Sequence, residues 1–190
     1  TMTAKIKLNA ASGGGSFSIQ APSSSSNNRV FTLPDSADAA LLTATAALGK
    51  IGQVLTQIYE PGGSDINATS SSYTDTNMQL AITPSNANSK ILILGIANGH
   101  RMNNASANAV INVKRAITGG STDNLSGQGL GLAHTYSTNA VTSTIFFVDA
   151  TTGTAERTYT VIHKCTSNSF TATTFRATTS NMFMLAEILP

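Results

Sequence analysis

The sequence predicts an all-β fold, an antiparallel β-sandwich of jelly-roll type preceded by an extended N-terminal arm of short strands. Three observations support this prediction. Strand-length apolar or alternating segments recur at a spacing of about 10 to 15 residues from residue 50 onward. Clusters of Gly, Pro, Asn and Ser separate them, as turns do. No segment of this region has the clear period of a helix.

The composition agrees with a folded, β-rich chain. Charged residues make up 11% of the sequence, against roughly 25% in an average soluble domain. Disorder usually combines high net charge with few β-branched residues, whereas here Val, Ile and Thr are plentiful and the net charge is only +2. We therefore expect a folded domain with a surface of neutral Ser, Thr and Asn side chains.

Charge and cysteine content exclude several classes of protein. The 11 Lys and Arg residues are scattered, and only Lys114-Arg115 pairs two of them, so no nucleic-acid partner is expected. The longest apolar run, Lys90–Ala97, is far shorter than the roughly 20 residues that span a bilayer. No membrane insertion is expected. The single Cys165 rules out an intramolecular disulfide. We expect Met2 to be the native start, without a secretory leader.

Residues 1–49 are predicted to form the arm. Ile6 and Leu8 alternate with polar residues, as do Phe17 and Ile19, and a flexible Gly-rich break lies between them. Residues 29–33 form a third short alternating segment. An isolated hairpin is marginal in water, so the arm needs partner chains, most simply copies of itself.

Residues 36–49 lie between the arm and the domain. Ser36 suits a helix N-cap and Gly49 a helix C-terminus, while Thr43 and Thr45 weaken a helix. A short helix and an irregular joint both remain open for this stretch.

Residues 50–190 are predicted to form the β-sandwich tip domain. Within it, Lys90–Ala97 is expected to be a structural strand buried on both faces, and Asn98–Ala109 a long polar loop where function begins. A Gly-rich stretch, Gly127–Asn139, forms a second irregular region. The predicted strands cover residues 51–59, 73–82, 90–97, 110–117, 141–148, 158–165, 169–177 and 182–189.

No catalytic residue, metal site or cofactor is predicted. The paired carboxylates of a glycosidase could only be Asp149 and Glu156, which are better explained as a charged turn that fixes a hairpin. The three histidines His100, His134 and His163 have no metal-ligand spacing. Three copies of one histidine on a three-fold axis would form a metal site, and this alternative stays open.

Five segments of the chain resemble tail-fibre and virion structural proteins of tailed bacteriophages, especially marine and cyanobacterial ones. They are IKLNAASGGGSFSIQAPSSSSNNRVFTLPD in the arm, and GQVLTQIY, YTDTNMQLAITPSNANSKILILGIANG, FFVDATTGTAERTYTV and MFMLAEI in the domain. The chain departs from related ones at Val113–Ala116, where a Leu-x-Arg is common. It also departs at Met184–Ile188, where related chains end in an apolar residue followed by Met-Glu-Ile.

The resemblance implies a homotrimeric fibre in the virion, in which the arm attaches to other virion proteins or forms a shaft and the sandwich forms the tip. We expect a receptor-binding tip that recognises a host-surface glycan or protein without catalysis. Its expected contact residues lie in the two irregular regions and offer stacking and hydrogen bonds: His100, Arg101, Asn103, His134 and Tyr136.

Two other functions remain open. A capsid decoration (cement) protein is favoured by the shortness of the chain, because 190 residues are few for a fibre that must reach a cell. A glycan depolymerase tip is the minor alternative, since no recognisable carboxylate pair supports it.

Overall fold

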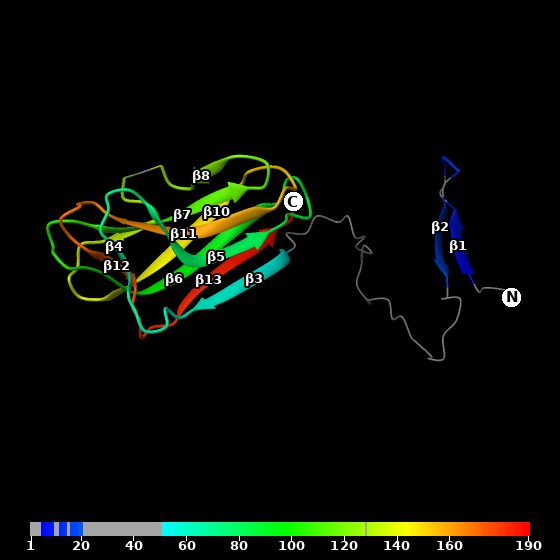
Figure 1. Cartoon of the computed structure of the whole chain (residues 1–190). Coiled ribbons are helices and arrows are strands. Elements are labelled where there is room, and N and C mark those ends of the chain that lie inside the picture. Colours follow the sequence, from blue (N-terminus) through cyan, green and yellow to red (C-terminus); the bar gives the residue numbers. More distant parts are fainter. Residues whose placement is uncertain (1–4, 10–11, 15, 21–50, 128) are drawn as a thin grey trace. The chain divides into compact units, whose positions relative to one another are not determined.

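The computed structural model describes residues 5–9, 12–14, 16–20, 51–127 and 129–190 (Figure 1). They belong to two units, which are described separately. The predicted strand over residues 29–33, the possible helix over 36–49 and the boundary between arm and domain lie outside the described residues.

The first unit is an antiparallel hairpin of β1 (Lys5–Asn9) and β2 (Ser16–Gln20). In its register Ile6 pairs with Ile19 and Leu8 with Phe17. The prediction of two short strands around a Gly-rich break is confirmed. A two-stranded hairpin has too little apolar surface for independent stability, so the need for a partner stays a prediction.

The second unit contains strands and turns, and no helix occurs among its described residues. The strands are β3 (Ile51–Tyr59), β4 (Ile66–Ala68), β5 (Thr74–Ile82), β6 (Lys90–Met102), β7 (Ala109–Ile117), β8 (Thr122–Asn124), β9 (Ala133–Thr135), β10 (Val141–Asp149), β11 (Arg157–Cys165), β12 (Ala172–Phe175) and β13 (Asn181–Ile188).

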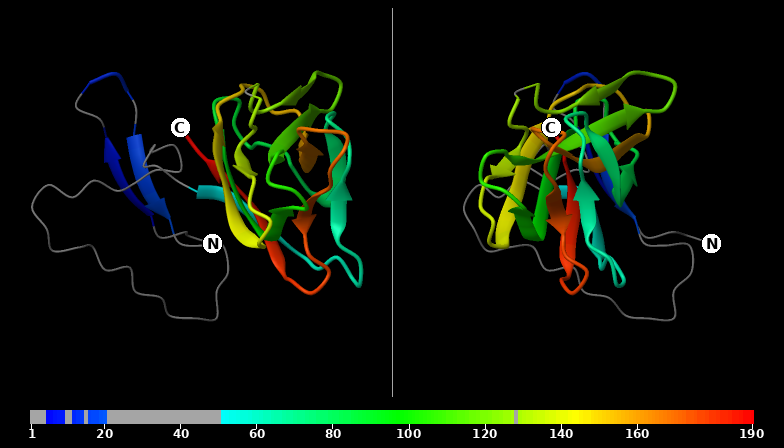
Figure 2. Two further views of the ribbon diagram at one scale, coloured as in Figure 1. Left: turned by 90° about the vertical axis from the view of Figure 1, so that its left-hand side faces the viewer. Right: turned by 60° about the vertical axis from the view of Figure 1, so that its left-hand side comes forward.

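These strands form two antiparallel sheets, which lie as two layers (Figures 1 and 2). In the six-stranded sheet, β6 lies between β13 and β10, β3 flanks β13, and β12 and β4 extend the sheet past the far part of β6. The five-stranded sheet has the order β5-β11-β7-β8, and β9 also pairs with β7.

The hydrophobic core fills the space between the two sheets. The six-stranded sheet contributes Ile93, Ile145, Phe183 and Leu185, and the five-stranded sheet contributes Met78, Ile111, Val113, Tyr159 and Val161. Each fully buried aliphatic or aromatic side chain contributes about 1.5–3 kcal/mol relative to exposure. The all-β, sandwich-like antiparallel fold predicted from the alternating segments is thus confirmed.

The prediction that Lys90–Ala97 is buried on both faces is wrong. Ile91 and Ile93 point into the core and are fully buried, whereas Leu92, Leu94 and Ile96 are only partly buried on the opposite face. Within the second unit, no other sheet of the described residues packs on that face. Alternate residues of the apolar run therefore belong to the core and to the opposite face of the sheet.

The prediction of a long polar loop over Asn98–Ala109 is also wrong in its first half, because β6 continues to Met102. Gly99 makes this possible as a β-bulge: Thr142 pairs with Asn98 and Val141 with His100, which leaves Gly99 opposite no residue. Its φ of +93° suits a glycine. The extra residue shifts the alternation, so that His100 turns inward and Arg101 outward.

The register also defines the two ends of the domain. Ile51 pairs with Ile188, which pairs with Lys90, so these residues lie at one end, here called the proximal end. Met102, β4 and β12 lie at the other, here called the distal end (Figure 1). The strands of the domain run between these two ends.

Candidate functional site

The distal end carries a cavity of about 380 Å³. Cross-strand pairing brings its wall together, because Arg101 of β6 pairs with Thr173 of β12, which pairs with Asn67 of β4. We call this cavity the distal pocket; its lining residues are Asp65, Asn67, Arg101, Met102, Asn103, Thr138, Thr171 and Thr173.

Arg101 is held in the pocket wall by Asp65. Its Nη2 lies 3.3 Å from Asp65 Oδ2, and the side chains are 37% and 26% exposed. The other oxygen of Asp65 accepts a 2.9 Å hydrogen bond from the backbone N–H of Ala177. An ion pair this exposed adds only about 0–1 kcal/mol to stability. Its main effect is to orient a guanidinium whose other N–H groups have no protein acceptor among the described residues.

Two asparagines in the wall use their side-chain oxygens internally. Asn103 Oδ1 accepts a 2.8 Å hydrogen bond from Thr171 N–H, and Asn103 N–H donates to the Thr171 carbonyl at 3.0 Å. Thr173 Oγ1 donates a 2.8 Å bond to Asn67 Oδ1. Each amide is thereby fixed with its NH₂ group as a donor.

The pocket is chemically suited to binding a neutral, hydroxyl-rich ligand. Fixed amide donors, a guanidinium and threonine hydroxyls provide directional hydrogen bonds. Glycoside hydrolysis needs two carboxyl groups about 5–9.5 Å apart. Among the described residues that line the pocket, Asp65 is the only carboxylate, and Arg101 engages it.

The structure brings two of the five predicted contact residues, Arg101 and Asn103, into the distal pocket. His100 is not at the surface. It is fully buried, and its Nδ1 lies 2.7 Å from Ser143 Oγ. The prediction that His100 lies in an exposed loop is wrong because the bulge at Gly99 turns its ring into the sandwich. Burial, with repulsion from His163 and His134, lowers the pKa of His100 to about 4.

His134 and Tyr136 lie on the segment that leads to the pocket but do not line it. His134 is exposed on β9, opposite Val110 of β7. Tyr136 is 64% exposed. The backbone carbonyl of the next residue, Ser137, accepts a 2.8 Å hydrogen bond from Met102 N–H. Thr138, which follows it, lines the pocket.

Sequence reasoning missed most of the wall, and no local motif marks it. Its members come from four distant segments. Three of them meet because β12 pairs with both β4 and β6, and the fourth, which contains Thr138, is joined to β6 by the backbone hydrogen bond from Met102 to Ser137. The alternation within residues 169–177 predicts a strand but gives no information about its partners. The missed residues are Asp65, Asn67, Met102, Thr138, Thr171 and Thr173.

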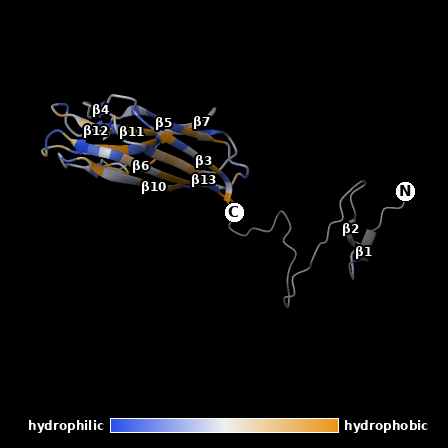
Figure 3. Ribbon diagram, turned by 90° about the horizontal axis from the view of Figure 1, so that it is seen from below, coloured by the Kyte–Doolittle hydropathy of each residue, from blue (hydrophilic) through white to orange (hydrophobic). Residues whose placement is uncertain are grey.

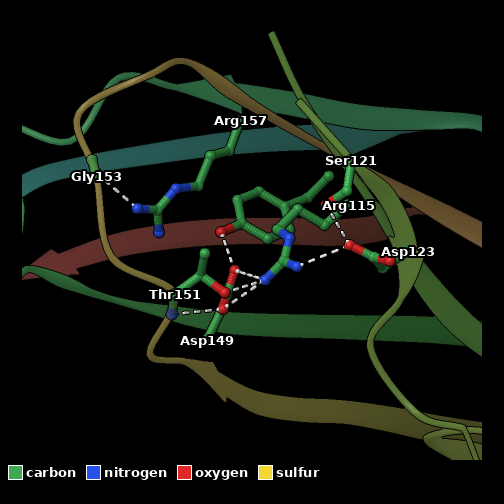
Figure 4. A network of polar contacts seen from close by, with 8 residues as sticks. Arg115, Ser121, Asp123, Asp149, Thr151, Gly153 and Arg157 are labelled. Atoms are coloured by element: carbon green, nitrogen blue, oxygen red, sulfur yellow. Dashed lines mark hydrogen bonds and ion pairs between the residues drawn. The ribbon is translucent and has the colours of Figure 1, made fainter. Parts of the chain in front are cut away.

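A second polar cluster, at the proximal end, is structural (Figure 4). Arg115 Nη1 donates to both oxygens of Asp149 at 2.9 and 3.0 Å, and its Nη2 donates to Asp123 at 3.0 Å. Asp149 is 4% exposed. Burial acts to raise the pKa of Asp149, but hydrogen bonds from Tyr159, Thr151 and Arg115 outweigh it and lower the pKa. Glu156, the other carboxylate of the predicted turn, is exposed. Asp149 is thus engaged by Arg115 and Tyr159, whereas Glu156 faces solvent.

In the described part of the chain, no group of three or more His, Cys, Asp and Glu residues is placed to hold a metal ion. That part likewise contains no helix capable of crossing a bilayer. Comparison with protein-family models and with curated proteins finds no match to this chain.

Proposed function

We propose that this chain is the non-catalytic receptor-binding tip of a bacteriophage tail fibre, a homotrimer that recognises the host surface. One observation carries the proposal: the polar distal pocket lies at the opposite end of the domain from Ile51, where the chain arrives from the arm. A tip domain needs this polarity, because its attachment and its ligand must lie at different ends. In this proposal residues 1–49 join the tip to other virion proteins.

The strand order supports a jelly-roll-like tip. Eight strands form two layers with the orders β3-β13-β6-β10 and β5-β11-β7-β8. Except for the consecutive β7 and β8, neighbours in each layer are not consecutive in the sequence, as in the jelly rolls of viral and lectin domains.

A glycan is the ligand class that the pocket supports best. Arg101, Asn67 and Asn103 supply donors whose orientation is already fixed by hydrogen bonds within the protein. Fixed donors reduce the entropy lost on binding. The exposed Tyr136 on the neighbouring segment offers an aromatic face for a sugar ring. Asp65 is paired with Arg101, which favours binding over depolymerase activity.

The test is binding of the labelled full-length protein to an array of bacterial surface polysaccharides and to cells of candidate hosts. We expect Arg101→Ala and Asn103→Ala each to weaken binding at least about tenfold, the effect of about 1.4 kcal/mol. Glu156→Ala, an exposed change outside the distal pocket, is the control and should bind as the parent does. Absence of binding at micromolar protein, or equal binding by all variants, would contradict the proposal.

A capsid decoration protein is the second candidate. The observation that favours it is an exposed apolar sheet face that includes Ile58 and Phe146, which would also suit packing on a capsid. Antibody labelling of intact virions separates the two: signal on the tail supports the tip, and signal on the head supports decoration.

A further inference from the structure

Four strands of the six-stranded sheet, β3, β13, β6 and β10, present an apolar face away from the core. Figure 3 shows hydrophobic residues recurring along these strands, which lie side by side. The register arranges twelve of these outward residues in three rows, here called the outer face. The rows are Ile58-Met182-Ile96-Thr144, Thr56-Met184-Leu94-Phe146 and Val54-Ala186-Leu92-Val148.

The outer face is unusually apolar for an antiparallel sheet in water. Such sheets normally place polar residues on the side that faces solvent, but here only Thr56 and Thr144 are polar and none of the twelve is charged. Ile58 is 72% exposed and Phe146 is 65% exposed. The five-stranded sheet differs, because its strands β5 and β7 are linked at the surface by the ion pair of Lys114 and Asp75.

We infer that the outer face is the interface through which copies of this chain assemble. The three-fold form of this assembly rests on the proposed homotrimeric fibre, whereas the face itself follows from the register and the exposures. In the assembly, β3 of one copy lies beside β10 of the next. The outer faces of three copies then surround the three-fold axis of the assembly.

The chemistry of the face favours a copy of the same chain over other partners. It offers no cation to a nucleic acid or an anionic lipid surface. It also has too few hydrogen-bonding groups for a glycan. An uncharged apolar surface is complementary to another copy of itself, because burying it leaves no charge unpaired.

The size of the face follows from the spacing of strands and residues. With strands about 4.8 Å apart and same-face residues about 6.8 Å apart, twelve positions cover a flat area of about 400 Å². The next row at the proximal end, Ile51-Ile188-Lys90, is charged and lies outside the outer face. Because side chains stand above this plane, each copy buries more than the flat area, and three faces together bury more than about 1,200 Å², divided among the three contacts of a trimer.

A three-fold arrangement also fits the width of the face. Four strands span about 19 Å, and three sheets of that width set as a triangle have their centre about 5.5 Å from each sheet. Half the usual separation of packed sheets is about 5 Å, so the side chains fill the centre. The most exposed side chains lie on the two outer strands: Ile58 and Val54 on β3, and Phe146 and Val148 on β10. These are the strands that meet at the corners.

The experiment measures the solution mass of the full-length protein by light scattering. We expect three copies for the parent chain, and a shift to monomer or a markedly weaker assembly for Ile58→Lys and for Phe146→Lys. Thr122→Lys adds the same charge to an exposed strand position of the other sheet and should remain a trimer. Circular dichroism and thermal unfolding establish that each variant is folded.

If the arm also associates, the mass alone does not locate the interface, and a cross-linking variant tests the outer face directly. Val54→Cys with Val148→Cys places thiols on β3 and β10 in one row, and the native Cys165 is buried. Oxidation should join separate copies into disulfide-linked dimers and trimers, whereas either single variant should give no covalent trimer. A monomeric parent, or an unchanged mass for both Lys variants without cross-linking, would overturn the interface.

Other outcomes separate this inference from the proposed function. A two-copy assembly that both Lys variants dissociate would keep the interface and overturn the three-fold arrangement. A parent trimer that cross-links as expected but binds no host surface would overturn the proposed receptor binding alone.

Discussion

The Tyr159 hydroxyl donates a 2.7 Å hydrogen bond to Asp149 Oδ2, which joins the two sheets of the sandwich inside the domain. Tyr159 belongs to β11 of one sheet and Asp149 to the end of β10 in the other. Both residues are buried. Burial, and then the neighbouring carboxylate, raises the pKa of Tyr159, so this hydroxyl stays a donor throughout the neutral range.

Tyr159→Phe should therefore lower the free energy of unfolding. A buried hydrogen bond to a charged group contributes about 1.5–3 kcal/mol, and we expect a loss in this range in urea unfolding. Tyr136→Phe removes the same hydroxyl from a 64% exposed side chain and should change stability by no more than about 0.5 kcal/mol. Equal effects of the two changes would contradict the role given to Tyr159.

Stability should fall as the pH is lowered from about 6.5 to about 4. Burial lowers the pKa of His100 and of His163 to about 4, against 6.5 when unfolded. The unfolded chain therefore binds protons first, and each histidine reduces the free energy of unfolding by up to about 3 kcal/mol over this window. Urea unfolding at pH 7, 6 and 5 measures the loss.

The carboxylates act in a separate pH window. Hydrogen bonds overcome the effect of burial and lower the pKa values of Asp149 and Glu187 below 3.8 and 4.5. Their stabilisation is present above those values and is lost only at lower pH. A protein whose stability is constant from pH 7 to pH 5 would contradict the burial of two neutral histidines.

Gly99→Ala should destabilise the domain more than Gly63→Ala. Both glycines have positive φ, +93° and +105°, so both substitutions strain the backbone by about 1 kcal/mol or more. A Cβ at Gly99 would also lie 2.2–2.8 Å from side-chain carbons of Arg176, whereas at Gly63 it would meet nothing within 4 Å. Thermal unfolding of the two variants compares them, and equal shifts would refute the close contact.

Glu187→Gln should weaken the attachment of the loop between β5 and β6. Glu187 is fully buried and accepts hydrogen bonds from Ser85 N–H at 2.6 Å, from Ser85 Oγ at 2.9 Å and from Gln53 Nε2 at 2.9 Å. An amide cannot accept all of them, and an unsatisfied buried donor costs about 1–3 kcal/mol. Hydrogen exchange should be faster at Ser85, and Glu60→Gln, which lies on the opposite turn, should leave it unchanged.

The strands could be predicted from the sequence because their signal is local. Alternation such as that of Met78, Leu80 and Ile82 has a period of two wherever one face is buried. The end of β6 at Met102 could not be predicted, because a glycine such as Gly99 between polar residues is as typical of a loop as of a bulge. As a result the inward turn of His100 could not be foreseen.

The distal pocket and the outer face depend on pairing between distant segments, and the sequence contains no comparable signal for it. The contact of Asn67 with Thr173 joins residues 106 positions apart. The apolar run around Leu92 and Leu94 predicts burial on both faces, but hydrophobicity alone does not tell whether another layer of the chain covers a face.

The single unpaired residue at position 99 determines which side chains after it in β6 point into the sandwich and which point to solvent. Deleting it would put the following residues in the opposite frame, so that the imidazole of His100 would face solvent and the guanidinium of Arg101 would enter the interior without a counter-ion. An unpaired interior charge costs several kcal/mol. Loss of a residue is therefore costly at this one position, whereas the exposed turn residues 104–106 can lengthen or shorten without altering the frame.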